Sequence, residues 1–180
     1  MSEYVMPTRP PQEGWDLHCH TVFSDGTRTP REMVQEAKSL GLHGVAIADH
    51  DTTAGWEEAG QASHDLHLPL MRGTEITAQD GNVSVHMLAY LYDPRNRHIC
   101  DLFEKTRRSR VERTKKMVAL LAKDYPISWQ SVLEQTKEGS RTTIGRPHIA
   151  DALVAAGAFP DRSAAFVKAL HPSGPYYVHH

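Results

Sequence analysis

Two histidines and a carboxylate lie close together in DLHCHTVFSDG, the segment of residues 16–26. One residue separates His18 from His20, and side chains alternate along an extended segment, so both imidazoles would point to the same side. Asp25 follows in the same segment. Such a pair can hold a metal ion between its imidazoles, although two solvated or hydrogen-bonded histidines are the simpler interpretation of the pair alone.

Three further residues of the same chemical types are found at or beside predicted strands: His50, Glu75 and His86. The chain has 12 His among 180 residues, and neutral imidazole is the commonest transition-metal ligand. Mixed imidazole and carboxylate ligands suit Mn, Fe or Zn, and a carboxylate can bridge two ions. Together these residues favour a metal centre over isolated histidines.

Strands and helices must bring these side chains together. Apolar runs predict strands over residues 15–18, 44–48, 68–76 and 83–91. Thr29, Pro30 and Glu32 form a helix start with a capping box. Gly41 ends that helix, and a second helix is expected over about residues 54–63.

Strands that alternate with helices predict a parallel α/β sheet or barrel, with a hairpin-like excursion at the third and fourth strands. In such folds, ligands and catalytic groups collect at the carboxyl ends of the strands, where we expect the candidate ligands. The only strand considered after residue 92 is a short one at residues 176–178. The pattern there is otherwise helical, with helices predicted over residues 99–123, 128–135, 147–156 and 163–170.

We therefore divide the chain into a lead-in over residues 1–14, an α/β core over residues 15–93 and a helical part over residues 94–180. The hydrophobic content of 39% and charged content of 23% are ordinary for a globular protein. No apolar run approaches the roughly 20 residues of a membrane span, and a net charge of -2 argues against a protein that coats nucleic acid. Two Cys and no secretory signal lead us to expect a cytoplasmic protein without a disulfide framework.

Five segments, in this order, resemble the PHP (polymerase and histidinol phosphatase) family: DLHCH, SDGT, GVAIADHDT, RGTEIT and VHMLAY. The resemblance is dense over about residues 15–92. The later stretch TIGRPHIADALVAAG resembles the helical insertion of the family's stand-alone metal-dependent phosphoesterases, which act on nucleotides or short oligonucleotide ends. The resemblance implies an α/β fold, namely the N-terminal part of a distorted (β/α)7-type PHP barrel with an inserted all-helical subdomain.

The resemblance also implies two or three divalent ions of Mn, Fe or Zn. It gives them six protein ligands, which are His18, His20, Asp25, His50, Glu75 and His86. In this scheme His18 and His20 bind one ion, and Glu75 bridges it to a neighbour.

Asp25 and His50 match ligands of a second ion, and His86 matches a ligand of a third ion that shares the bridging carboxylate. Asp49 has an alternative role, because its carboxylate could orient His50 or cap the following helix. The same alternative applies to Asp51.

The chemistry implied is phosphoester hydrolysis by a metal-activated water, with no Ser or Cys nucleophile. The expected substrates are nucleotides, such as 3′,5′-nucleoside bisphosphates, or the 5′ ends of short oligonucleotides. The chain has no GxxxxGK[ST] loop, which argues against P-loop triphosphate hydrolysis. Two alternatives stay open: a phosphatase of the histidinol-phosphate type, and a truncated module that binds metal or phosphate without catalysis.

Contacts to the substrate phosphate are implied for Arg146 and His148, which match phosphate-contacting residues of the family. Pro147 is expected at the first helical position, where free backbone N–H groups favour an anion; the alternative is a surface cap. The basic run RRSRVERTKK, residues 107–116, could attract a polynucleotide. Its helical spacing and Glu112 favour a solvated helix face instead.

Family members continue beyond the helical insertion through strands that carry an AHP-like motif and a late Asp-x-His. Three expected ligands, one carboxylate and two imidazoles, are therefore missing from the 180 residues. Either the chain is a fragment of a longer protein, or a partner or self-association covers the open half-barrel. The activity of the 180-residue chain itself depends on this choice.

Overall fold

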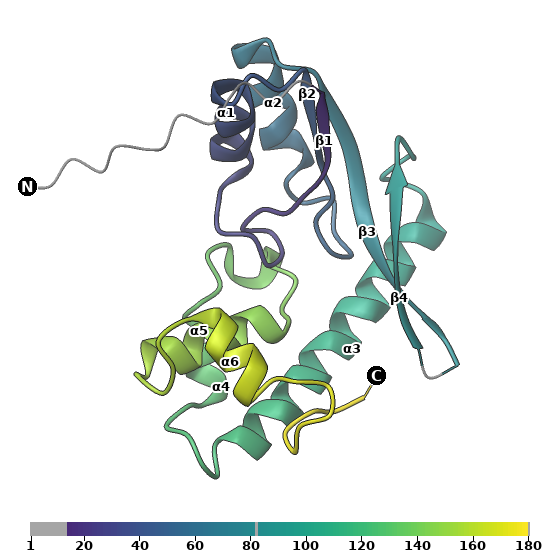
Figure 1. Ribbon diagram of the computed structural model, residues 1–180. Helices are drawn as coiled ribbons and strands as arrows, with labels where there is room; N and C mark the ends of the chain where they lie inside the picture. Colours follow the sequence, from purple (N-terminus) through teal and green to yellow (C-terminus); the bar gives the residue numbers. More distant parts are fainter. Residues whose placement is uncertain (1–13, 82, 180) are drawn as a thin grey trace, which may run out of the picture.

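The computed structural model describes residues 14–81 and 83–179, which form an α/β part and a helical part (Figure 1). The predicted lead-in lies outside the described residues, except for Gly14. In Figure 1 the α/β part lies above the helical part, and a long helix runs from beside the sheet down to the other helices.

Four strands form one sheet in the order β1-β2-β3-β4. Their bounds are Trp15–Cys19 for β1, Gly44–Ile47 for β2, Leu70–Asp80 for β3 and Val83–Tyr90 for β4. The first three strands are parallel to one another, whereas β4 is antiparallel to β3. The predicted α/β class and the hairpin are confirmed, and the curled sheet is a partial barrel (Figure 1).

Two helices pack against the sheet, α1 (Pro30–Ser39) and α2 (Trp56–Leu66). The predicted capping box is present: Thr29 Oγ1 accepts a hydrogen bond from Glu32 N at 3.2 Å, and Glu32 Oε2 accepts one from Thr29 N at 2.8 Å. The continuous apolar run of β2 is fully buried, as expected for a central parallel strand. The core between helices and sheet consists of Met33, Val34, Ala37, Val45, Ile47, Ala59, Ala62 and Leu68.

The helical part has its own core, which includes Met117, Leu121, Ile149, Leu153 and Leu170. Its elements are α3 (Arg97–Leu121), α4 (Trp129–Leu133), the 3-10 helix η1 (Gly139–Arg141), α5 (Arg146–Ala155) and α6 (Arg162–Lys168). Within residues 14–81 and 83–179, no helix is long and apolar enough to cross a membrane. Along the sequence, the residues of the first core precede residue 93 and those of the second core follow residue 94. The domain boundary at this place stays a prediction.

The strand considered at residues 176–178 is wrong, because this segment is irregular. Arg113 Nε donates a hydrogen bond to Val178 O at 2.6 Å, and the guanidinium of Arg113 lies 4.8 Å from the centroid of the Tyr177 ring. The side chain of Arg113 in α3 therefore bonds the backbone of this segment, which forms no strand.

Candidate metal centre

The six candidate ligands lie together at the sheet. They form three overlapping groups, and within each group one ligand atom per residue lies within 4.8 Å of the others. The groups are His18–His20–Glu75, His20–Asp25–His50 and His50–Glu75–His86. Three neighbouring positions are therefore surrounded by imidazole and carboxylate donors.

Glu75 belongs to two of these groups. Its Oε2 lies 2.7 Å from His18 Nε2 and 2.9 Å from His20 Nε2. Its Oε1 lies 2.7 Å from His86 Nδ1. Burial raises the pKa of Glu75, but the hydrogen bond from His18 and the nearby imidazoles outweigh burial and hold the pKa below its usual value. A carboxylate with imidazoles at both oxygens is suited to bridging two ions.

Asp25 lies between His20 and His50 in the middle group. Asp25 Oδ1 is 2.9 Å from His20 Nδ1, and Asp25 Oδ2 is 3.6 Å from His50 Nε2. Burial opposes ionisation of Asp25, but hydrogen bonds from both imidazoles hold its pKa well below the usual range. In the part of the chain that the structure describes, buried His50 Nδ1 has no hydrogen-bond partner. An unpaired buried nitrogen is otherwise costly, so this ring fits a metal ligand.

Cys19 lies between the two histidines in sequence but not in the cluster. Strand alternation turns its side chain toward the core under α1 and α2. Burial, with the nearby carboxylate of Asp16, raises the pKa of the Cys19 thiol to about 12. A thiol that stays protonated is a poor metal ligand, so the imidazoles are the better candidate donors at this end of β1.

The loop after β1 folds back tightly to bring Asp25 beside His20. Gly26 N donates to Thr21 O at 3.0 Å, and a Cβ at Gly26 would lie 2.2 Å from His20 O. A side chain there would collide with backbone rather than with a movable group. The glycine of the SDG segment is therefore required for the loop to close.

Asp49 anchors the same loop from the end of β2. Its buried carboxylate accepts hydrogen bonds from Thr21 N at 2.7 Å, Thr21 Oγ1 at 2.6 Å and Ser24 Oγ at 2.6 Å. The two roles suggested for Asp49 are wrong, because among the described residues it bonds neither His50 nor the first turn of α2. Asp49 positions the loop that carries Asp25.

Asp51 anchors strand β3 through similar hydrogen bonds. Its carboxylate accepts hydrogen bonds from Thr77 N at 2.8 Å, Thr77 Oγ1 at 2.7 Å and Arg110 Nε at 3.0 Å. Asp51 N also donates to Glu75 O at 3.1 Å. These bonds connect β3 to the loop after β2 and to α3, and they leave Asp51 no helix-capping role.

A comparison with protein families now identifies the chain. The PHP domain family matches residues 16–158. The chain belongs to this family. The match covers the α/β part and the helical part as far as residue 158.

Two curated relatives of this PHP chain have names that state an activity. A 3′,5′-nucleoside bisphosphate phosphatase from Chromobacterium violaceum is 32% identical over 172 residues, which are 92% of this chain and 58% of the relative. A 5′-3′ exoribonuclease from Haemophilus influenzae is 28% identical over 156 residues, which are 87% of this chain and 56% of the relative. The chain thus spans somewhat more than half the length of these relatives.

Two solved structures share the fold. A Bifidobacterium adolescentis protein assigned as a metal-dependent phosphoesterase is 64% identical with a TM-score of 0.90, over 94% of this chain and 59% of that one. An amidohydrolase from Chromobacterium violaceum, with bound sulfate and no metal, is 32% identical with a TM-score of 0.83, over 92% of this chain and 58% of that one.

We expected the candidate ligands at the ends of strands, but two of them lie elsewhere. Glu75 lies in the middle of β3 and His86 in the middle of β4, because both strands run on into the hairpin. Thr77 and His86 are cross-strand partners, so their side chains share a face with Glu75, two residues from Thr77. Register places these two candidate ligands, β1 places His18 and His20 at its end, and the segments after β1 and β2 place Asp25 and His50.

The basic run at residues 107–116 is not simply a solvated face. Arg110 is nearly buried against Asp51, and Arg107 Nη2 donates to Ser140 O at 2.7 Å. Arg113 bonds Val178 O. Spacing by three places these arginines on one side of α3, where they connect it to other segments.

Arg146 is turned away from the metal cluster. Its Nη1 donates to Leu170 O at 3.3 Å, and its guanidinium lies 5.5 Å from the ring centroids of Phe166 and Tyr177. Helix α5 begins at Arg146, one residue earlier than predicted. Phosphate binding by Arg146 stays a prediction.

His148, in contrast, lies beside the loop that carries Asp25. His148 Nδ1 accepts a hydrogen bond from Gly145 N at 3.2 Å. Burial lowers the pKa of His148 despite the nearby Asp25 carboxylate, so the ring is neutral near pH 7. It lines a cavity of about 170 Å³ whose other walls include Ser24 and Arg162.

Sequence reasoning missed Arg162. Its Nη1 donates to Asp25 O at 3.2 Å, while its Nε and Nη2 both donate to the carboxylate of Asp151 at 2.5 Å. These partners are 137 and 11 residues away, so no local pattern indicates the contacts. Arg162 follows Asp161, the N-cap of α6, and this helix cap is the recognisable local signature in the segment.

Proposed function

We propose that this chain carries the metal centre of a phosphoesterase that hydrolyses nucleotide phosphate esters, such as 3′,5′-nucleoside bisphosphates, or the 5′ ends of short oligonucleotides. The three overlapping donor groups around Glu75 are the observation that carries the proposal. The names of the phosphatase and exoribonuclease relatives supply the substrate class.

The residues present fit divalent ions of Mn, Fe or Zn, because their donors are imidazoles and carboxylates. His18 and His20 would hold one ion with Glu75. Asp25 and His50 would hold a second, and His86 would hold a third together with Glu75. Such ions lower the pKa of a bound water towards neutrality and neutralise charge on a phosphoryl group.

The hydroxyl groups of Ser24 and Thr21 and the thiol of Cys19, near the candidate ligands, are already hydrogen-bonded or buried. Ser24 Oγ donates to Asp49, and Thr21 Oγ1 donates to the same carboxylate. The Cys19 thiol is turned into the core, with a pKa of about 12. These contacts support hydrolysis by water without a protein nucleophile.

The surrounding residues hold the ligands in place and prepare the site for an anion. Asp49 fixes the loop of Asp25, and Asp51 fixes β3 beside Glu75. Nδ1 of neutral His148 accepts a hydrogen bond from Gly145 N, so its proton is on Nε2, and this N–H can donate a hydrogen bond to a phosphate oxygen beside this loop. Substrate phosphate contacts by His148 and by Arg146, after a rotamer change, belong to the proposal.

The test pairs metal analysis with phosphate release from 3′,5′-bisphosphorylated adenosine. Because the chain spans 58% of the phosphatase relative, bound metal is measured separately from turnover. His18→Ala should bind less metal and lose turnover, whereas His64→Ala, at a side chain that is 84% exposed, should keep both. Full metal content and turnover in His18→Ala would refute the proposal. Faster turnover of histidinol phosphate would favour that substrate, and metal binding without any turnover would favour a non-catalytic module.

The open sheet edges are the basis for a proposed partner. Among the described residues, β1 and β4 each have one unpaired edge. They expose the apolar side chains Trp15, Leu17, Met87 and Leu88. Bare edges promote association, so we propose that another polypeptide or a second copy covers them. A monomer at all concentrations in sedimentation velocity would rule out self-association.

A further inference from the structure

The loop after β1, residues 20–27, is held by the helical part as well as by Asp49. It carries the candidate ligand Asp25, and four of its backbone oxygens accept hydrogen bonds from the helical part. The donors and acceptors are Lys137 Nζ and Thr27 O at 2.7 Å, Thr142 Oγ1 and Val22 O at 3.0 Å, Thr143 N and Phe23 O at 2.8 Å, and Arg162 Nη1 and Asp25 O at 3.2 Å.

The bonds of Asp49 do not extend to Asp25. Among the described residues, the Asp49 carboxylate bonds Thr21 and Ser24, which precede Asp25 in the loop. The contacts of the Asp25 carboxylate with the neighbouring imidazoles join one candidate ligand to another. An ion among these ligands would replace such contacts, so another group has to fix the position of Asp25 in the loaded site.

Arg162 is suited to this task, because its guanidinium is itself held in a fixed orientation. Nε and Nη2 both donate to the carboxylate of Asp151 at 2.5 Å, and Nη1 donates to Asp25 O. A guanidinium that bonds one carboxylate through two nitrogens has a defined plane, so its third nitrogen has a defined direction. Asp151 belongs to α5 and Arg162 to α6, and this pair between two helices directs a donor at the backbone of the loop.

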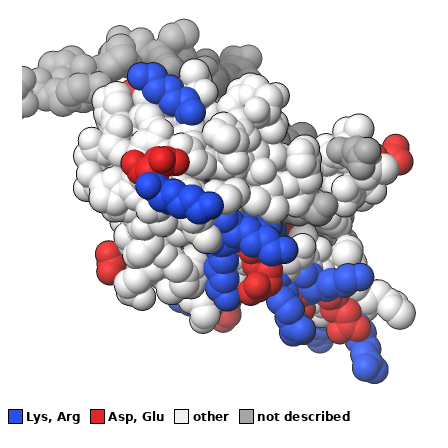
Figure 2. Space-filling view, turned by 90° about the horizontal axis from the view of Figure 1, so that it is seen from below, with Lys and Arg blue, Asp and Glu red and all other residues white. Residues whose placement is uncertain are grey.

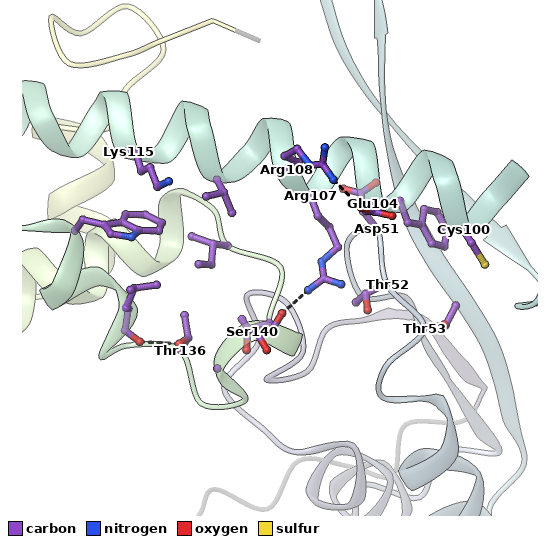
Figure 3. Close-up of a pocket in the computed structure, with 17 residues that line it drawn as sticks. Asp51, Thr52, Thr53, Cys100, Glu104, Arg107, Arg108, Lys115, Thr136 and Ser140 are labelled. Carbon is purple, nitrogen blue, oxygen red and sulfur yellow. Dashed lines mark hydrogen bonds and ion pairs between the residues drawn. The ribbon is translucent and has the colours of Figure 1, made fainter. Parts of the chain in front are cut away.

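The other donors belong to the segment around η1, which α3 holds in place. Figure 3 shows the side chain of Arg107 reaching from α3 to Ser140 in η1, where Nη2 donates to the backbone oxygen at 2.7 Å. Thr142 and Thr143 follow η1 directly, and both are buried against the loop. The contacts that support the loop are therefore part of the packed structure of the helical part.

We propose that the helical part positions the metal centre, and that Arg162, oriented by Asp151, is the positioning residue for Asp25. This inference rests on the proposed function, because it takes Asp25 as a ligand of the second ion. A carboxylate on a fixed backbone is preorganised for an ion, so no free energy is spent on ordering the loop when the ion binds. Arg162 acts through the backbone of Asp25 and is not itself a ligand.

The charge of Arg162 and its hydrogen bond to Asp25 O affect a bound cation in opposite directions. A guanidinium repels a nearby divalent cation, so loss of the charge alone would tighten metal binding. Loss of the hydrogen bond would release the loop and weaken metal binding at Asp25. The sign of the change in Arg162→Gln therefore separates positioning from simple electrostatics.

The experiment is an NMR titration of the isotope-labelled chain with Zn²⁺, which is diamagnetic, with the free ion set by a competing chelator. The ¹³C signal of the Asp25 carboxyl reports the group His20–Asp25–His50, and the ring ¹⁵N signals of His18 report the group His18–His20–Glu75. In Arg162→Gln, the Asp25 signal should respond at about tenfold higher free Zn²⁺, whereas the His18 signals should respond as in the unsubstituted chain. A general loss of structure would move both responses alike.

Lys168→Gln is the matched control, because it removes a positive charge from an exposed position of the same helix. Seen from below, Lys and Arg side chains lie among Asp and Glu side chains (Figure 2), so one exposed charge contributes little to the potential at a distant site. Zn²⁺ affinity at both positions should change by less than about twofold in this variant.

A second measurement needs no metal. In the presence of EDTA, the amide hydrogens of Ser24 and Gly26, which both bond Thr21 O, should exchange about tenfold faster in Arg162→Gln than in the unsubstituted chain. The same amides should exchange at the unsubstituted rate in Lys168→Gln.

Three results with Arg162→Gln would each overturn the proposal: unchanged amide exchange in the loop, unchanged or tighter Zn²⁺ binding at Asp25, or equal weakening at Asp25 and at His18. Each of them would leave the proposed phosphoesterase function standing. An unsubstituted chain that binds no Zn²⁺ at either position would instead refute the metal centre, and this proposal with it.

Discussion

Charged side chains are used differently in the α/β part and in the helical part. In the α/β part, the carboxylates of Asp49 and Asp51 are at most 1% exposed and bond residues between 25 and 59 positions away. In the helical part, Glu104 pairs with Arg108 one turn along α3, with both side chains at least 70% exposed. Asp49 and Asp51 therefore stabilise the interior of the α/β part, whereas Glu104 lies on the surface of the helical part.

This difference predicts which substitutions should destabilise the protein most. Removing the partner of a buried carboxylate leaves an unpaired charge. Removing the carboxylate itself leaves donors without an acceptor. Both changes are costly. An exposed pair exchanges its partner for water at little cost. The predictions below test this contrast, from the largest expected effect to the smallest.

Glu75→Gln should have the largest effect, because it removes the one carboxylate shared by two donor groups. Metal affinity should fall by more than about 100-fold, beyond the loss typical of residues that only support a ligand. Isothermal titration with Mn measures this. The matched control is Gln79→Glu on the same strand, which should leave affinity unchanged. Unchanged affinity in Glu75→Gln would remove the metal centre from the α/β part.

Asp49→Ala should destabilise the metal-free chain by about 4 kcal/mol, because Thr21 N, Thr21 Oγ1 and Ser24 Oγ all lose their acceptor. Urea unfolding measures the change. Asp101→Ala, on the exposed face of α3, is the control and should cost less than about 0.5 kcal/mol. A loss below about 1 kcal/mol in Asp49→Ala would show that the loop needs no anchor.

Local patterns predicted the parts of the fold that depend on neighbours in sequence. Thr29 and Glu32 close a capping box within one helical turn, and the strand and hairpin positions follow from apolar runs and turn residues. The residue types in DLHCHTVFSDG likewise indicated a cluster, although metal binding by it stays a prediction.

Contacts across long sequence distances could not be predicted in this way. Arg162 bonds Asp25 O from 137 residues away, and Arg110 bonds Asp51 from 59 residues away. The segment at residues 176–178 has a strand-like composition, but Arg113 bonds its backbone in place of a strand. In each case a residue far away in the sequence determines the contact or the local conformation, and hydrophobic periodicity contains no information about that residue.

Arg110→Gln should cost about 3 kcal/mol, since it leaves the buried carboxylate of Asp51 without its cation. The loss should appear in urea unfolding of the metal-free chain, and the double variant Arg110→Gln with Asp51→Asn should recover part of it. No recovery in the double variant would mean that the guanidinium acts through packing rather than through the ion pair.

Gly26→Ala should cost about 2 kcal/mol and weaken the metal position at Asp25, because the new Cβ would meet His20 O at 2.2 Å. Gly60→Ala is the control: nothing lies within 4 Å of its added Cβ, and it lies inside α2, so it should be neutral or stabilising. Unfolding and Mn titration of both variants test the difference. Equal behaviour of the two would mean that the loop after β1 adjusts freely.

Arg108→Gln should have the smallest effect, below about 1 kcal/mol, because its pair with Glu104 is exposed and lies within one helix. The small loss should shrink further in high salt, since exposed charges are screened, whereas the loss in Arg110→Gln should hardly change. Urea unfolding at low and high salt compares the two variants directly. A salt-independent loss of about 3 kcal/mol in Arg108→Gln would abolish the contrast, because a surface pair of the helical part would then behave like the buried pair of the α/β part.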